Sequence, residues 1–110
     1  MTDKEAFREA VYTIVRMIPA GRASSYGAVA HAAGYPGRAR LVGHLMAGAS
    51  EQDIPAHRVV NSQGVLSGKV AFGTGDEMQR LLEAEGIVVR HDRISDWKAV
   101  FWNPLLEIRL

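Results

Sequence analysis

The stretch over residues 54–62, IPAHRVVNS, contains the residue types that could perform chemistry. Pro55 fixes its own φ angle and favours an extended residue before it, and the valine pair that follows Arg58 favours a strand. A sharp turn between these pieces would present Ala56, His57 and Arg58 at a pocket. Histidine can accept a proton near neutral pH, but the methyl group of Ala56 supplies no nucleophile for it to activate.

Cysteine is absent from the 110 residues, so the chain can form no disulfide, no thiolate metal site and no thiol nucleophile. Its four histidines do not have the spacing of metal ligands. We therefore expect neither a metal nor a cofactor. The histidines are His31, His44, His57 and His91.

Length and hydropathy indicate one domain. A chain of 110 residues with 47% apolar and 23% charged residues can bury a single core, so we expect one domain over residues 1–110. No apolar run approaches the roughly 18 residues of a membrane span. The first residues, MTDKE, are polar and differ from a secretory signal. These features predict a cytoplasmic monomer without membrane contact, nucleoid-associated if the source is prokaryotic.

Positive charge is concentrated in the middle of the chain. The net charge is only +1, but residues 20–70 hold five basic and two acidic residues, while the remainder has a small acidic excess. The basic residues in this range are Arg22, Arg38, Arg40, Arg58 and Lys69. This asymmetry is consistent with a nucleic-acid partner but is too small to establish one.

Three helices are predicted in the N-terminal half. Apolar residues at helical spacing predict an amphipathic helix over residues 3–18, ended by Pro19. The serine pair 24–25 offers an N-cap for a second helix that ends near Ala33. After a glycine-rich turn, a third helix is predicted over residues 38–48, with a core stripe of Leu41, Val42, Leu45, Met46 and Ala49. Two short helices joined by a tight turn are typical of a helix-turn-helix, with the third helix in the recognition position.

The C-terminal half predicts a wing, a fourth helix and a tail. Residues 59–70 contain the turn signal Ser62-Gln63-Gly64 between two short extended pieces, which predicts a hairpin or loop beside the pocket that resembles a wing. Thr74 to Glu77 resembles a capping box that opens a helix ending at Gly86. A short strand over 87–89 and a tail with both tryptophans follow. The expected fold class is mainly α with a short β-hairpin or wing, as in winged-helix domains.

Four stretches in register resemble one known family. PAHRV at residues 55–59 resembles the Pro-Cys-His-Arg-Val active-site motif of the O6-alkylguanine-DNA alkyltransferases, with Ala56 in place of the cysteine. The supporting matches are IPAG with SYGAVA at 18–30, RARLVG at 38–43 and LLEAEG at 81–86. Because the nucleophile is missing, the chain resembles the alkyltransferase-like proteins, which bind alkylated DNA and do not repair it themselves.

The resemblance implies that the side chains of a proton relay are present without the nucleophile that the relay would activate. In the transferases, the histidine after the cysteine accepts a proton through water, and a glutamate at the end of a later helix orients it. The matching positions are His57 and Glu85. Without a thiol, we expect these two side chains to hydrogen-bond and brace the turn, with no catalytic residue in the chain. The family's Asn-Pro pair is also replaced, by Ala49-Ser50.

The resemblance also implies a DNA-binding surface on the helix pair. Arg40 matches the arginine that fills the gap left by an everted nucleotide. Tyr26 matches a tyrosine that helps rotate the nucleotide's phosphate. Gly43 and Ala47 match small residues that let the third helix approach the minor groove closely. For each residue a purely structural role remains the alternative. Arg22 and Ser62 are further candidate phosphate contacts.

A pocket for the damaged base is implied beside these contacts. By the same resemblance, its expected lining residues are Tyr26, Met46, Ala56, Val59, Lys69 and Trp97. Lys69 falls where alkyltransferase-like proteins can have an arginine, and a cation there could lie over an aromatic base. Core packing is the alternative for Met46 and Val59, and a solvated surface position is the alternative for Lys69.

Three functional interpretations follow, in this order. The first is a non-enzymatic sensor that everts O6-alkylguanine from duplex DNA and directs the site to nucleotide excision repair. The second is a winged-helix regulator that reads an undamaged sequence, which would leave the motif at residues 55–59 unexplained. The third is an enzyme that uses another nucleophile, or His57 with Glu85, to remove the alkyl group.

Overall fold

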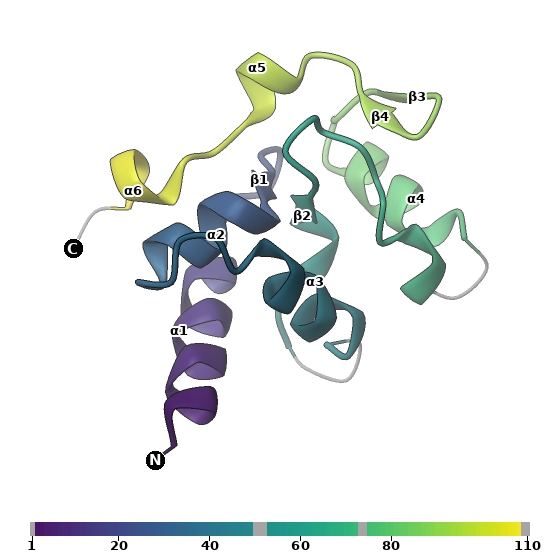
Figure 1. The fold of residues 1–110 in the computed structure, drawn as a ribbon. Coiled ribbons are helices and arrows are strands. Elements are labelled where there is room, and N and C mark those ends of the chain that lie inside the picture. The colour runs from purple at the N-terminus through teal and green to yellow at the C-terminus, as the bar shows by residue number, and fades with distance from the viewer. Residues whose placement is uncertain (1, 50–52, 73–74, 109–110) are drawn as a thin grey trace.

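The computed structural model describes residues 2–49, 53–72 and 75–108. The first three helices form one half of the molecule, the fourth helix and a hairpin form the other, and the C-terminal tail runs back across the first half (Figure 1). The elements are α1 (Asp3–Met17), β1 (Ser24–Ser25), α2 (Tyr26–Ala32), α3 (Ala39–Ala47), β2 (Val59–Val60), α4 (Glu77–Ala84), β3 (Val89–Arg90), β4 (Arg93–Ile94), α5 (Trp97–Val100) and α6 (Pro104–Glu107), with 3₁₀ turns η1 (Ala56–Arg58) and η2 (Lys69–Ala71).

Helix α1 forms as its sequence predicts. The hydroxyl oxygen of Thr2 accepts a hydrogen bond from the backbone N–H of Glu5 at 3.2 Å and so caps the first turn. The apolar stripe from Phe7 to Val15 is buried, and Ile18 ends the helix with 1% of its surface exposed. Burial of this stripe stabilises the helix more than intrinsic propensity does.

The predicted helix-turn-helix is confirmed by α2 and α3. The Ser25 hydroxyl accepts from the N–H of Ala28 at 3.1 Å and caps α2. In the connecting turn, Gly34 and Gly37 both adopt positive φ angles, which glycine tolerates without strain. On α3, Val42 and Met46 are buried. Leu41 was expected in the same stripe, but it is 45% exposed because it lies on the flank of the helix.

Strands β1 and β2 join the two halves of the molecule. They pair in parallel, with Ser24 opposite Val59 and Ser25 opposite Val60. One core cluster packs α1, α2 and α3 together with Trp102 from the tail. The second cluster lies beneath α4 and contains Val60, Leu66 and Ile94. The short parallel pair thus places the segment around Ala56 between two cores.

Of the hairpin or loop predicted over residues 59–70, the structure forms the loop and not the hairpin. The turn at 62–64 does form, because the Asn61 side-chain oxygen accepts from the N–H groups of Gln63 and Val65, both at 2.9 Å. However, the segment after this turn does not pair with β2. Val65 instead forms a bridge to Arg93, far along the chain.

The hairpin of this fold is formed by β3 and β4. They pair antiparallel, with Val89 opposite Ile94 and Arg90 opposite Arg93. The two residues at the tip, His91 and Asp92, have φ angles of 52° and 60°, as a two-residue hairpin turn with matching twist requires. Of the strand expected over residues 87–89, only Val89 lies in a strand, and β3 continues to Arg90.

Helix α4 begins at Glu77, with Asp76 at its N-cap. The capping box was predicted to start at Thr74, which lies outside the described residues. The predicted end at Gly86 is confirmed: Gly86 has a φ of 89°, and the N–H of Ile87 donates to the carbonyl of Leu82 at 3.1 Å. This ending delivers Glu85 to the junction between the two halves.

Glu85 accepts hydrogen bonds from two other segments, the turn after α1 and η1. Arg58 donates to its carboxylate through Nε and Nη2, with a shortest distance of 2.8 Å, and also donates to the carbonyl of Ile18 at 2.8 Å. His57 Nε2 lies 2.8 Å from Oε2, and the N–H of Gly21 donates to Oε1 at 3.1 Å. The Glu85 side chain is only 15% exposed. Burial alone would raise the pKa of Glu85, but the hydrogen bonds from Arg58, His57 and Gly21 outweigh it and lower the pKa to about 2.

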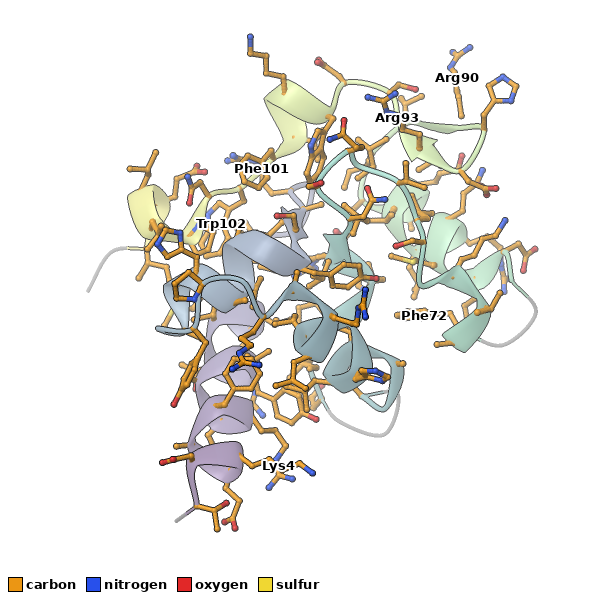
Figure 2. All side chains as sticks on the ribbon, in the orientation of Figure 1. Lys4, Phe72, Arg90, Arg93, Phe101 and Trp102 are labelled. Atoms are coloured by element: carbon orange, nitrogen blue, oxygen red, sulfur yellow. The ribbon has the colours of Figure 1, made fainter. Side chains whose placement is uncertain are left out.

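The tail is held to Arg22 and Ala23, just before β1, by backbone and side-chain bonds. Trp102 donates its N–H to the carbonyl of Ala23 at 2.7 Å, and its ring is 4% exposed where the tail passes α2 (Figure 2). Arg22 donates to the carbonyls of Val100 and Phe101 at 2.9 and 2.7 Å. It also forms an ion pair with Glu107 at 3.1 Å. The expectation that the tail packs on the domain is confirmed for Trp102.

The low pKa of Glu85 predicts how stability depends on pH. A carboxyl whose pKa falls from 4.5 to about 2 on folding contributes its full stabilisation above about pH 4.5, and loses it as the pH falls toward 2. The shift corresponds to about 3 kcal/mol. We expect the unfolding free energy of Glu85→Gln, measured by urea titration at each pH, to decline less between pH ~5 and ~2.5 than that of the wild type. Glu83→Gln, an exposed carboxylate on the same helix, should keep the wild-type decline. An equally steep decline in Glu85→Gln would contradict the assignment.

Candidate DNA-binding site

The outer face of α3 borders a hollow of about 510 Å³. One wall is the exposed side of α3, the second is the first residue of α2, and the third is the segment just before η2. The lining residues are Tyr26, Ala39, Arg40, Gly43, His44, Ala47, Ser67 and Gly68. Ligand pockets commonly have volumes of roughly 300–1,000 Å³, so the hollow is large enough for a small organic group such as a nucleobase.

Arg40 lies on a ridge between this hollow and a neighbouring one. The second hollow is lined by Gly37, Arg38, Arg40, Leu41 and His44. Arg40 is exposed, and its guanidinium forms no hydrogen bond or ion pair with any residue that the structure describes. An unengaged cation on the exposed face of the second helix of a helix-turn-helix is available to enter a DNA groove.

Small residues keep the face of α3 open beside Arg40. A β-carbon built on Gly43 would meet no atom within 4 Å, and Ala47 is exposed one turn further on. The hollow's floor is thereby formed partly by helix backbone. A surface of this kind allows close approach by a flat or rod-shaped partner, as predicted for these two residues.

Tyr26 closes the hollow against the segment before η2. Burial raises the pKa of the Tyr26 phenol, and a hydrogen bond with the Ser67 side chain opposes part of that rise. A β-carbon on Gly68 would lie 2.6 Å from the Tyr26 hydroxyl oxygen. The absence of a side chain at position 68 therefore permits this contact, which brings α2 and the Ser67–Gly68 segment together.

Three residues predicted to line the lesion pocket lie in the core instead. Met46, Ala56 and Val59 are 4%, 5% and 1% exposed, and none of them lines the hollow. All three belong to the cluster that packs α1, α2 and α3, against which the half-buried Tyr26 also packs. Protein interiors are densely packed, so a methyl group at position 56 is covered by its neighbours and leaves no open floor.

Lys69 and Trp97 have partners outside the hollow. Lys69 Nζ forms an ion pair with Asp92 Oδ2 at 2.7 Å, which holds it against the tip of the β3–β4 hairpin. Trp97 donates from Nε1 to the carbonyl of Ser62 at 3.1 Å, and its ring lies over Gly64. Of the six predicted pocket residues, only Tyr26 therefore lines the hollow.

The two candidate phosphate contacts differ in availability. Ser62 is exposed in the turn after β2. Arg22 is engaged with Glu107 and the tail carbonyls, so the structure gives it the role of holding the tail. The sequence offered no signal for this role, because its partners lie nearly 80 residues away.

Sequence reasoning missed four residues of the hollow. His44 follows Arg40 by four positions on α3 and so shares its exposed face, which helical spacing alone could have indicated. Ala39 was recognised only as part of a motif. Ser67 and Gly68 follow a turn, and only the three-dimensional structure brings them opposite α3.

The predicted pair of His57 and Glu85 is present, and Arg58 joins it as an unpredicted partner. The neighbouring position is Ala56, so this cluster surrounds no nucleophile. Its geometry is that of a brace that holds three chain segments.

Within the described ranges, no helix is both long and apolar enough to cross a membrane. In that same part of the chain, no three acidic or histidine side chains gather as metal ligands.

Comparisons with known proteins agree with this geometry. Residues 6–87 match the family model described as the 6-O-methylguanine DNA methyltransferase, DNA binding domain. A "DNA base-flipping protein" of Vibrio parahaemolyticus is 41% identical over 102 residues, which cover 91% of this chain and 99% of the relative. "Alkyltransferase-like protein 1" of Schizosaccharomyces pombe is 35% identical over 106 residues, 91% of this chain and 97% of that protein.

A solved structure matches the whole arrangement. Atl1 of S. pombe, in complex with damaged DNA containing O6-carboxymethylguanine, superposes with a TM-score of 0.79 at 33% identity, covering 93% of this chain and 98% of that one. Both the sequence and the helix-turn-helix architecture are thus shared over nearly the full length. The chain therefore belongs to the family of the 6-O-methylguanine DNA methyltransferase DNA-binding domain, and within it resembles the alkyltransferase-like proteins.

Proposed function

We propose that this protein is a non-enzymatic sensor that binds O6-alkylguanine in duplex DNA and holds the damaged nucleotide outside the helix. The observation that carries this proposal is the hollow beside Arg40, on the exposed face of the helix-turn-helix. The names of the relatives support it, since one is called a base-flipping protein and another was crystallised with alkylated DNA.

The proposed steps of recognition combine the resemblance to the alkyltransferase-like proteins with the positions of the side chains. Helix α3 enters the minor groove, where Gly43 and Ala47 allow close approach. Eversion of a base costs a few kcal/mol of stacking, and the guanidinium of Arg40 fills the vacated space. The everted base enters the hollow between α3 and the Ser67–Gly68 segment, with Tyr26 at its back.

The protein binds the lesion without removing it. The whole sequence contains no cysteine, and Ala56 occupies the nucleophile position of the motif. The cluster of His57, Arg58 and Glu85 is fully engaged as a brace, with its carboxylate shared among three donors. A monomer that marks the site in this way would act in the cytoplasm or nucleoid and pass the lesion to nucleotide excision repair.

The alternative of a sequence-reading regulator makes a different prediction. A regulator would prefer a defined undamaged sequence, whereas a sensor prefers one alkylated base in any sequence. The hollow favours the sensor. A regulator reads base edges directly with side chains that project from α3, and this readout does not require a cavity beside the helix.

The first experiment tests Arg40. We expect Arg40→Ala to bind a duplex with one O6-methylguanine several-fold more weakly than the wild type does, with unchanged thermal stability, because the side chain has no internal partner. Fluorescence anisotropy titrations measure the affinity. Arg16→Ala, an exposed arginine on α1 outside the hollow, should bind as the wild type does. Equal affinity of the wild type for damaged and undamaged duplexes would refute the sensor. Loss of the methyl group from the recovered DNA would instead favour an enzyme.

The second experiment tests the hollow itself. We expect Gly68→Ala to weaken lesion binding several-fold, because the added β-carbon would displace the Tyr26 hydroxyl group from its present position. The ring carbon that bears the hydroxyl lies 3.9 Å from that β-carbon, an ordinary contact distance. Gly68→Ala should therefore cost less affinity in a Tyr26→Phe background than in the wild type. Additive losses in the double variant would show that the two positions do not share the binding site.

A further inference from the structure

The β3–β4 hairpin contains an unusual pair of like charges. Arg90 and Arg93 lie directly opposite each other across the two strands, on the face turned away from the core, whereas Val89 and Ile94 are buried on the other face. Both arginines project from the hairpin toward solvent (Figure 2). Like charges directly opposite in an antiparallel pair destabilise it. The repulsion between the two arginines therefore destabilises the hairpin, and binding of an anion between them would reduce this repulsion.

No acidic side chain in the described part of the chain forms an ion pair with either arginine. Arg93 donates from Nε to the backbone carbonyl of Gln63 at 3.0 Å, a neutral acceptor. Arg90 forms no side-chain hydrogen bond or ion pair with any described residue. The one acid in the hairpin, Asp92, is paired with Lys69 at 2.7 Å, and Asp96 forms no ion pair with either arginine. Two guanidinium groups thus remain exposed on one small surface.

The hairpin is fixed to the segment that walls the hollow. Asp92 accepts at its backbone carbonyl from the N–H of Leu66 at 2.8 Å, and Ile94 donates to the carbonyl of Gly64 at 2.9 Å. Ser67 and Gly68, the next residues along, face α3 across the hollow. Residues 61–68, which follow β2, thus lie between α3 and the hairpin (Figure 1). Arg93 also contacts the turn that contains Ser62.

We propose that the β3–β4 hairpin is a second DNA contact, in which Arg90 and Arg93 bind backbone phosphates beside the nucleotide that α3 everts. This inference rests on the proposed function in taking DNA as the ligand. Planar guanidinium groups are suited to phosphate oxygens, and phosphate contacts position a protein on the duplex without reading its bases. The connection to the hollow favours DNA over an acidic protein surface, because one rigid segment joins the hairpin to the base-binding wall.

The test compares the double variant Arg90→Gln/Arg93→Gln with the wild type. Both are titrated with the same duplex, with and without one O6-methylguanine, at several salt concentrations. We expect severalfold weaker binding to both duplexes at low salt, and a salt slope smaller in magnitude by about one to two, since each phosphate contact contributes about 0.9. The ratio of the two affinities should be unchanged. Thermal stability should be equal or higher, because the repulsion is gone.

The matched control removes the same charge elsewhere. Arg8→Gln/Arg16→Gln, both on α1, changes two exposed arginines that form no ion pair with a described residue and line neither the hairpin nor the hollow. It should keep a salt slope close to that of the wild type. Arg90→Gln alone retains the bond from Arg93 to Gln63, so it tests the charge even if the double variant is unstable; we expect half of the slope change.

The outcomes separate this inference from the proposed function. A double variant that binds both duplexes with wild-type affinity and salt slope would overturn the hairpin contact, leaving an acidic protein surface as its partner. A wild type without preference for the damaged duplex would refute the sensor, yet a reduced salt slope of the double variant on undamaged DNA would still support the hairpin contact.

Discussion

The carboxylate of Glu85 is the constraint on which the arrangement of this domain depends. It lies just beyond α4 and accepts hydrogen bonds from the turn after α1 and from both His57 and Arg58 of η1. A nearly buried carboxylate is tolerated only if its oxygens are well supplied with donors. Three segments must therefore meet at one point, where the end of α4, η1 and the turn after α1 come together.

This constraint explains how a motif can persist without its chemistry. In a transferase, a histidine and a glutamate beside a thiol would move a proton. Here the neighbour is Ala56, which is packed into the core, and the same two side chains hold the fold together with Arg58. Removing Arg58 would take away the cation that pairs with this mostly buried carboxylate, which destabilises the fold. Their retention is thus accounted for by structure alone.

Local sequence signals predicted the helices. Features that depend on partners far along the chain could not be predicted from the sequence. Capping serines, glycine turns and apolar spacing placed α1, α2 and α3 within about one residue. Residues 59–70 form a loop and not a hairpin because Val65 pairs with Arg93 across 28 positions and leaves β2 without an antiparallel neighbour. Lys69 was assigned to the pocket by the family resemblance, and its partner Asp92, far along the chain, could not be identified from spacing. Arg40 is exposed opposite the core stripe of α3, which helical spacing can indicate because a helix face is a local property.

The same pairings change where positive charge is available. Of the five basic residues at 20–70, Arg22, Arg58 and Lys69 are paired with Glu107, Glu85 and Asp92. Among the described residues, the unpaired cations of that range are Arg38 and Arg40, both at the start of α3. Buried or paired charges attract a polyanion weakly, because their field is cancelled locally. Within residues 20–70, the available positive charge is therefore limited to the start of α3. Further unpaired positive charge lies outside this range, at Arg90 and Arg93 of the hairpin. A protein with a net charge of only +1 can in this way direct DNA to one side of a single hollow.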